Sequence, residues 1–208
     1  MKKVSIELTN VKKFVILAAK PAAGKGWLCK NVFLDHLNLD FDLIETGQML
    51  RDFSNGADPM SRKVSETMKA GNPVDNDLVI HIVFKALEKC QKEMIVLDGF
   101  PRTDIQFKIM DRINIGGDFA GIVIDRSNEW VITKAAERSI ETGRSDRGLD
   151  KRIHLFTDET RPGMEKLVRT KQMPLFQTRR DIDLLEEAVD MNKFFNLQNF
   201  RKKEVITT

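Results

Sequence analysis

The loop Ala19-Lys20-Pro21-Ala22-Ala23-Gly24-Lys25-Gly26-Trp27 is the first segment whose residue types are suited to chemistry. It follows an apolar run and precedes a helical pattern, so its backbone N–H groups and the positive end of the helix could bind a polyphosphate. Lys25 would place its ammonium group among the phosphates. The general phosphate-loop pattern has glycine where Ala19 stands and Ser or Thr where Gly26 stands. Taken alone, the segment fits a simple Gly-Lys-Gly helix start equally well.

The string Asp98-Gly99-Phe100-Pro101-Arg102-Thr103 also follows an apolar run directly. A carboxylate at a strand end, here Asp98, can orient a magnesium ion through its waters. The planar guanidinium of Arg102 suits a phosphate group. The structural alternative is a turn in which Gly-Phe-Pro supplies an apolar anchor.

Two further strings contain arginines, and neither string by itself indicates an anion-binding site. The string Thr46-Gly47-Gln48-Met49-Leu50-Arg51 places an arginine one helical turn beyond a glycine. Arg138, the string Gly143-Arg144-Ser145-Asp146 and Arg152 bring three arginines around one polar loop. Such arginines repel each other unless an anion neutralises them. A surface helix and a solvated loop are the alternatives.

Strand and helix patterns alternate between these motifs. Continuous apolar runs at 14–18, 94–97 and 120–124 indicate strands buried on both faces, and 41–44 and 173–176 are shorter candidates. Helical patterns are found at 24–37, at 60–68, after a predicted N-cap at Asp75, from 128, from 150, and around 184–189. The alternation predicts an α/β fold with a five-stranded parallel sheet and helices on both faces, in which ligands bind beyond the carboxyl ends of the strands. A short exposed strand is also expected at 4–8.

Length and composition limit the classes of protein that remain. The chain has 208 residues, 41% of them apolar, which fits one globular domain. No apolar run approaches the roughly 20 residues of a membrane span. Two cysteines, both in helix-like segments, suggest no disulfide framework, so we expect a cytoplasmic protein. The 34 basic residues form no stripe with interleaved aromatics, so we expect no nucleic-acid partner.

The order and spacing of the four motifs resemble the adenylate kinase family of nucleoside monophosphate kinases, over about residues 14–156. The string DGFPRT is the most specific element of the resemblance. The resemblance implies a phosphate-loop NTPase-like fold, ATP and AMP as substrates, Mg²⁺ as cofactor, and a monomer. Within a single kinase domain, 1–208, it implies a monophosphate-binding unit at 46–74 and a short lid at 138–152.

The resemblance also implies roles for individual residues. The groups that neutralise the transferring phosphoryl would be Lys25, Arg102, Arg138, Arg144 and Arg152. The groups that bind ATP would be Ala22, Ala23, Gly24, Lys25, Gly26, Trp27, Lys134 and Arg138. The groups that bind AMP would be Thr46, Arg51, Val74, Gly99, Arg102 and Gln106. Asp98 would hold the metal through water, and Asp146 would help the lid to close.

The identity of the acceptor base depends on two of these positions. Thr46 and Gln106 match positions that face adenine in relatives resembling adenylate kinase, whereas pyrimidine-specific relatives tend to have Ala and Asn there. The resemblance therefore favours transfer of the γ-phosphoryl of ATP to AMP. A kinase for CMP or UMP, and a nucleotide-binding module without turnover, are the alternatives.

Several residues depart from the family's pattern. Trp27 replaces a threonine that helps hold the nucleotide phosphates, and Ala22 replaces a glycine, so a positive φ there would cost about 1 kcal/mol. Gln48 replaces an acid, Arg147 replaces the second lid acid, and Lys134 replaces an arginine that stacks on the ATP base. We therefore expect a divergent enzyme with slow turnover.

Overall fold

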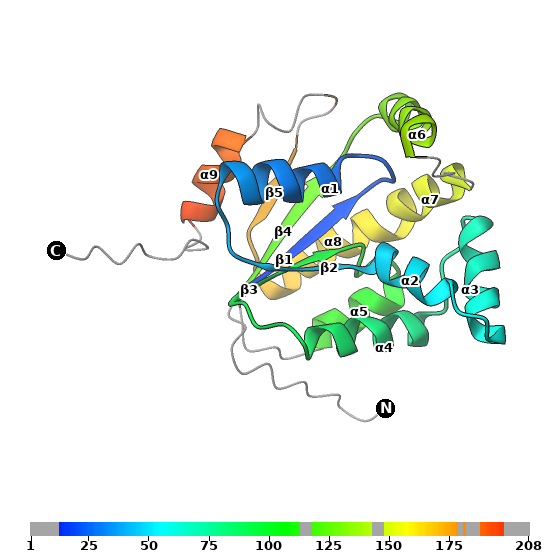
Figure 1. Cartoon of the computed structure of the whole chain (residues 1–208). Helices are drawn as coiled ribbons and strands as arrows, with labels where there is room; N and C mark the ends of the chain where they lie inside the picture. The colour runs from blue at the N-terminus through cyan, green and yellow to red at the C-terminus, as the bar shows by residue number, and fades with distance from the viewer. Residues whose placement is uncertain (1–12, 113–117, 143–147, 179–180, 182–187, 198–208) are drawn as a thin grey trace.

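Five parallel strands form the centre of the protein (Figure 1). The computed structural model describes residues 13–112, 118–142, 148–178, 181 and 188–197. The strand order is β2-β3-β1-β4-β5, with bounds β1 (Lys13–Ala19), β2 (Asp42–Glu45), β3 (Met94–Asp98), β4 (Asp118–Ile124) and β5 (Leu175–Gln177). The predicted five-stranded parallel sheet is confirmed.

Side chains of β1 alternate between two apolar clusters, one on each face of the sheet. Phe14 and Ile16 belong to the first cluster, and Val15 and Leu17 to the second. The first cluster is completed by α4 (Asn76–Leu87), α5 (Asp104–Arg112) and α8 (Arg161–Lys171). The second is completed chiefly by the helix after β1 and by α9 (Ala188–Leu197), as Figure 1 shows. The residues of β1 from Phe14 to Ala19 are therefore apolar whichever way they point, which explains the continuous apolar run.

The helix after β1 changes its hydrogen-bonding pattern along its length. It begins as α1 (Lys25–Trp27) and continues as the π-helical segment η1 (Leu28–His36). The Leu37 N–H donates to the Val32 carbonyl, five residues back, rather than four. The predicted helix at 24–37 is present, but its widened form was not predicted. Its apolar residues recur every four to five positions, a spacing that still buries them on one side.

Two helical units lie beyond the carboxyl edge of the sheet. The first contains α2 (Thr46–Ser54) and α3 (Pro59–Lys69), whose N-cap Asp58 accepts from two backbone N–H groups. The second contains α6 (Asn128–Thr142), α7 (Leu149–Leu155) and the π-helical η2 (Phe156–Thr160). Helix α6 continues four residues past Arg138, where a loop was expected, because no glycine or proline interrupts it there.

The predicted cap and boundaries of individual helices and strands are in part confirmed and in part wrong. The side chain of Asp75 caps α4 by accepting from the Leu78 N–H, as predicted. Strand β5 begins two residues later than expected, and Cys90 lies beyond the end of α4 rather than within a helix. The strand expected at 4–8 and the first part of the helical pattern at 184–189 lie outside the described residues. Among the helices that the structure describes, none has the length and apolarity needed to cross a membrane.

The strand register brings four strand ends to one edge. Asp98 at the end of β3 is level with Leu17 of β1 and with Glu45 of β2, and Ala19 is level with Ile124 of β4. The segments that follow these strands therefore emerge side by side. They include three of the four motifs that the sequence singled out.

Candidate active site

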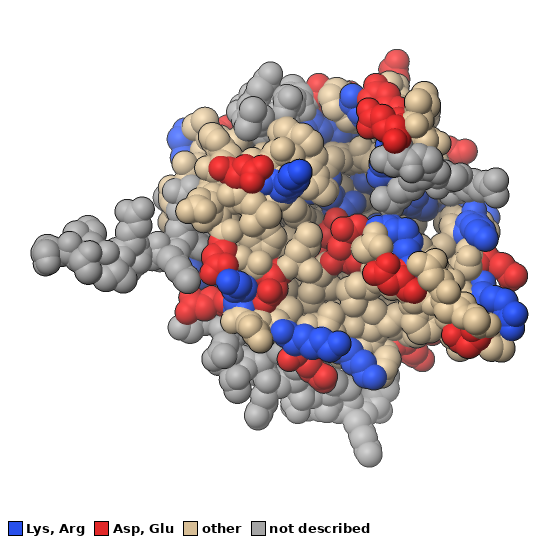
Figure 2. All heavy atoms as spheres, in the orientation of Figure 1, with Lys and Arg blue, Asp and Glu red and all other residues tan. Residues whose placement is uncertain are grey.

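A cleft of about 1280 Å³ lies at this edge, between the sheet and the two helical units. Figure 2 shows Lys and Arg side chains in the hollow toward the upper right of the view. The expected site residues that line the cleft are Ala22, Ala23, Gly24, Lys25, Gly26, Trp27, Thr46, Arg51, Val74, Asp98, Gly99, Arg102, Gln106, Lys134, Arg138 and Arg152. Arg144, with Asp146 and Arg147, lies outside the described residues. Every other expected site residue is thus brought to one cleft.

The phosphate loop turns into α1 through two residues with positive φ. Gly24, the N-cap, has φ 97°, which costs a glycine nothing. Ala22 has φ 56°, and its methyl group makes this conformation unfavourable. The strain expected if Ala22 took a glycine's conformation is therefore present in the structure. Its cost is about 1 kcal/mol.

Lys25 lies at the centre of the cleft's positive charge. Its Nζ is 3.5 Å from the Asp98 Oδ1, and both side chains are almost buried. Burial lowers the pKa of Lys25 below its ordinary value of 10.5; Arg102 and Arg152 lower it further, whereas Asp98 opposes the shift. The ammonium is therefore incompletely neutralised by the protein, and a polyanion would stabilise it.

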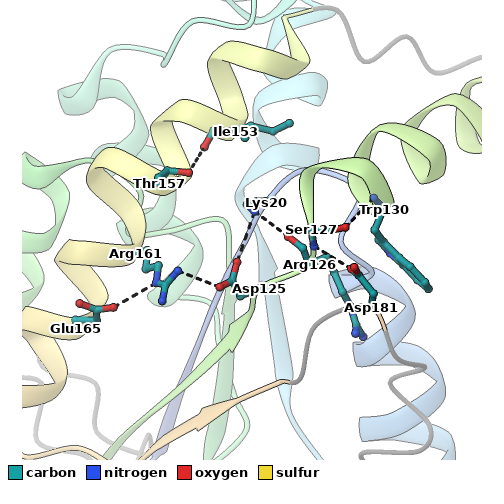
Figure 3. Close-up of polar contacts among 10 residues, drawn as sticks. All are labelled: Lys20, Asp125, Arg126, Ser127, Trp130, Ile153, Thr157, Arg161, Glu165 and Asp181. Atoms are coloured by element: carbon teal, nitrogen blue, oxygen red, sulfur yellow. Dashed lines mark hydrogen bonds and ion pairs between the residues drawn. The ribbon is translucent and has the colours of Figure 1, made fainter.

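A buried ionic cluster anchors the start of the phosphate loop (Figure 3). Lys20 Nζ donates to the Arg126 carbonyl at 2.7 Å and lies 3.5 Å from Asp125 Oδ1. The other Asp125 oxygen accepts from Arg161 Nη1 at 3.0 Å. Asp125 is 3% exposed, so it requires both cations. The cluster joins the loop after β1 to the end of β4 and to α8.

On the side of α2, Arg51 is held by neighbours from its own motif. Its Nη2 is 3.0 Å from Glu45 Oε1, and its Nε and Nη2 both donate to Gln48 Oε1. The Gln48 amide also donates to Asp52. Gln48 therefore contacts the arginine expected to bind the monophosphate. The Gln48 amide oxygen thus accepts from Arg51 at the position where the resemblance implies an acid.

Thr46 and Gln106 line the same side of the cleft, and both are buried. The Thr46 hydroxyl has no hydrogen-bond partner among the described residues, although it is inaccessible to water. A buried hydroxyl without a partner costs about 1–3 kcal/mol. A ligand atom that accepts or donates at this point would recover that cost.

On the opposite side, α6 and α7 contribute cations. Arg138 and Arg152, expected in or beside a loop, lie within these helices and face the cleft from both. Lys134 is paired with Glu137 at 2.7 Å and lies 5.4 Å from the centre of the Trp130 ring. Trp27 is 42% exposed and lines the cleft, so its indole is accessible to a ligand.

The residues present fit a magnesium ion held in part by substrate phosphates. Among the described residues no three His, Cys, Asp or Glu side chains gather as a metal cage. Magnesium commonly keeps several waters and uses one or two carboxylates together with phosphate oxygens. Asp98, at the strand end and beside Lys25, is suited to that role.

Sequence reasoning did not single out Lys20, Glu45 or Asn76. Glu45 ends a strand as Asp98 does, and this shared position was the signal that would have revealed it. Asn76 follows the predicted N-cap and accepts from Thr103 and Gln106. Lys20 stands inside the phosphate loop, but its partners Asp125 and Arg126 follow β4, more than 100 residues along the chain, so the sequence held no indication of them.

Comparisons with known proteins agree with this geometry. A family model described as "Adenylate kinase" matches residues 17–171. An adenylate kinase from Thermus thermophilus is 28% identical over 159 residues, which cover 74% of this chain and 82% of the relative. A UMP-CMP kinase from Gallus gallus is 26% identical over 84% of this chain and 93% of the relative. An adenylate kinase 3 from Oryza sativa subsp. japonica is 38% identical over 64% of this chain and 53% of the relative.

The family model spans well over half of the chain and contains the phosphate loop, the DGFPRT string and both flanking arginines of the polar loop. The five-stranded parallel sheet and the cleft of about 1280 Å³ that these motifs line agree with that assignment. The chain therefore belongs to the adenylate kinase family, of which it is a divergent member, and it is a phosphotransferase of the nucleoside monophosphate kinase class.

Proposed function

We propose that this protein transfers the γ-phosphoryl group of ATP to AMP and so forms two molecules of ADP. The relatives include adenylate kinases and a UMP-CMP kinase, so membership of the family leaves the acceptor base open. The observation that carries the choice of AMP is the buried, unpartnered hydroxyl of Thr46 on the side of the cleft that also contains the Gln106 amide. Thr46 and Gln106 are the two residues that the resemblance to the family associates with binding of adenine.

The remaining groups suit the charge changes of the reaction. Phosphoryl transfer needs positioning and charge neutralisation more than covalent help. Lys25 and the backbone from Ala22 to Gly26 would hold the donor phosphates, while Arg51 and Arg102 would hold the monophosphate. Arg138 and Arg152 would neutralise the transferring group. Arg144 would join them if its position follows the family's pattern.

A magnesium ion would be held by the phosphate groups of the donor nucleotide and, through water, by Asp98. Bound there, it would neutralise negative charge that builds up on the phosphate oxygens. Asp98 would meanwhile keep Lys25 charged, because their ion pair opposes the effect of burial on the pKa of Lys25. The same carboxylate would thus orient both cations.

We also propose that 46–74 acts as the monophosphate-binding unit and 138–152 as the lid of one monomeric kinase domain in the cytoplasm. The monomer is the state that the resemblance to the family implies. Both cysteines are free, which suits a reducing compartment. Light scattering of the purified protein would test the first point, and a dimer that gains activity on assembly would contradict it.

The test is a coupled assay for ADP with ATP and each of AMP, CMP, UMP and GMP. We expect kcat/KM to be highest for AMP. The matched variants are Thr46→Ala and Gln106→Asn, which install the pyrimidine pattern and should reduce kcat/KM for AMP more than for CMP. Comparable wild-type values for AMP and CMP would contradict the acceptor assignment. Nucleotide binding without ADP formation from any acceptor would instead identify a binding module.

A further inference from the structure

A hydrogen-bonded cluster lies directly behind the base-reading side of the cleft. The Arg102 N–H donates to Gln106 Oε1 at 2.9 Å, and the Gln106 N–H donates to Thr103 Oγ1 at 3.4 Å. The Thr103 hydroxyl donates to Asn76 Oδ1 at 2.7 Å, and Gln106 Nε2 donates to the same oxygen at 2.9 Å. Thr103 and Gln106 are buried, so water cannot easily replace these bonds. Asn76 does not line the cleft, whereas its two partners Thr103 and Gln106 do.

Two backbone groups determine the direction of every bond in the cluster. A backbone N–H can only donate, so the atom of Gln106 that faces the Arg102 N–H must be the amide oxygen. The Gln106 NH₂ group must then face Asn76. An NH₂ group can only donate, so the Asn76 atom that it meets must be the oxygen. The Thr103 hydroxyl lies 2.7 Å from the same oxygen, which can only accept, so the hydroxyl proton is directed to Asn76.

This fixed polarity limits what Gln106 can offer a ligand. Of its four hydrogen-bonding sites, one N–H and one oxygen lone pair are not used within the cluster. A 6-aminopurine presents a donor at position 6 and an acceptor at N1, whereas a 6-oxopurine presents an acceptor and a donor in these places. A freely rotating glutamine amide can read either pattern by turning over. A glutamine held at both ends can read only one.

We propose that Asn76 is a positioning residue that holds the Gln106 amide in one orientation and thereby lets the acceptor site distinguish AMP from a 6-oxopurine monophosphate. This proposal rests on the proposed function, in which Gln106 faces the acceptor base. Asn76 contributes no group to the base. Its oxygen accepts from the Thr103 hydroxyl and from the Gln106 NH₂ group. Without that oxygen, the Gln106 amide would keep one anchor within the cluster, the Arg102 N–H.

The first test compares kcat/KM for AMP and IMP in the wild type, Asn76→Ala and Asn76→Asp. The alanine variant removes the acceptor, whereas aspartate keeps an oxygen for both donors. We expect Asn76→Ala to reduce the AMP/IMP ratio about five- to tenfold, the worth of one lost hydrogen bond, through KM rather than kcat. Asn76→Asp should keep most of the wild-type ratio. A wild-type ratio in Asn76→Ala, or a ratio reduced equally in both variants, would overturn the proposal.

A second measurement needs no turnover. The side-chain amide hydrogens of Gln106, assigned by their absence from the spectrum of Gln106→Met, should exchange slowly with solvent in the wild type. Exchange should quicken in Asn76→Ala and slow again in Asn76→Asp, and Asn76→Ser serves as the second truncation if alanine prevents folding. If the wild type shows no preference for AMP, the proposed acceptor fails. Unchanged exchange in the truncated variants would overturn the role of Asn76 by itself.

Discussion

Gly71 and Gly148 meet backbone to backbone, one after α3 and the other at the start of α7. A methyl group built on Gly71 would lie 2.5 Å from the Gly148 Cα and 2.6 Å from its carbonyl oxygen. Both residues have positive φ, 71° and 66°. Beside them, Lys151 Nζ donates to Asn72 Oδ1 at 3.0 Å. The proposed monophosphate-binding unit and the proposed lid thus touch where neither backbone has room for a side chain.

This contact predicts that Gly148→Ala slows the enzyme. The added methyl group would separate the two units, and the positive φ adds a cost of about 1 kcal/mol. We expect kcat with AMP to fall at least about tenfold, since small misplacements of reacting groups have effects of this order or larger. Gly163→Ala is the control, because its methyl group would clash with the Phe107 ring away from the cleft. Equal activity loss in the two variants at equal melting temperature would show that instability alone is responsible.

Arg102→Ala should lose most activity while remaining folded. The guanidinium lines the cleft, and the contacts of Arg102 to Gln106 and Thr160 use only its backbone. A charge-assisted contact that strengthens in the transition state is worth about 100-fold or more in rate. Arg112→Ala, at the exposed last residue of the following helix α5, is the control. Wild-type turnover of Arg102→Ala, at limiting and saturating AMP alike, would remove Arg102 from the site.

Trp27→Thr should raise kcat with little change in the KM for AMP. The indole cannot place a donor where the family's threonine hydroxyl lies, and a lost donor to developing charge costs about 100-fold in other enzymes. Because Trp27 is 42% exposed, its removal should cost little stability. Trp130→Phe leaves Trp27 as the single tryptophan, and its fluorescence should then respond to ATP. A well-folded Trp27→Thr that is slower than wild type would identify the indole as an adapted part of the site.

Ala22→Gly should raise the free energy of unfolding by about 0.5 kcal/mol, the difference between relieved strain and added unfolded-state entropy. Glycine adopts the φ of 56° at this position without strain, and this gain exceeds the entropy that glycine adds to the unfolded chain. The measurement is chemical denaturation without nucleotide. Ala23→Gly provides the control, because Ala23 is absent from the residues with positive φ and glycine should destabilise it. Equal destabilisation by both changes would contradict the strain argument.

The pH dependence of ATP binding should report the lowered pKa of Lys25. Bound phosphates favour the charged ammonium, so above the lowered value binding also takes up a proton, and affinity falls by up to about tenfold per pH unit. Stability of the free protein should behave oppositely. Between the lowered value and 10.5, the unfolded chain binds more protons at this residue, so Lys25 makes stability rise with pH.

Calorimetry in buffers of different ionisation enthalpy measures the proton uptake directly. Lys25→Met should bind ATP weakly and lack this component of the pH profile. A wild-type affinity that stays constant up to pH 10.5 would refute the account, since it would place the pKa of Lys25 at its ordinary value in both states.

The sequence by itself determined the sheet and most of the cleft. Apolar runs such as 94–97 are buried on both faces, and this pattern specifies parallel strands covered by helices without knowledge of distant contacts. Because parallel strands end at one edge, the motifs after β1, β2 and β3 had to meet once that topology was given. The residue types at those ends then indicated phosphate chemistry.

Only the tertiary structure decided the partners of these groups. The Lys20–Asp125–Arg161 cluster, the bonds of Asn76 to Thr103 and Gln106, and the Gly71–Gly148 contact each join residues far apart in the chain. Local propensity and periodicity depend on neighbours within a few residues, so they carry no information on such pairs. The lowered pKa of Lys25 has the same origin, because burial and the charges of Asp98, Arg102 and Arg152 exist only in the folded chain.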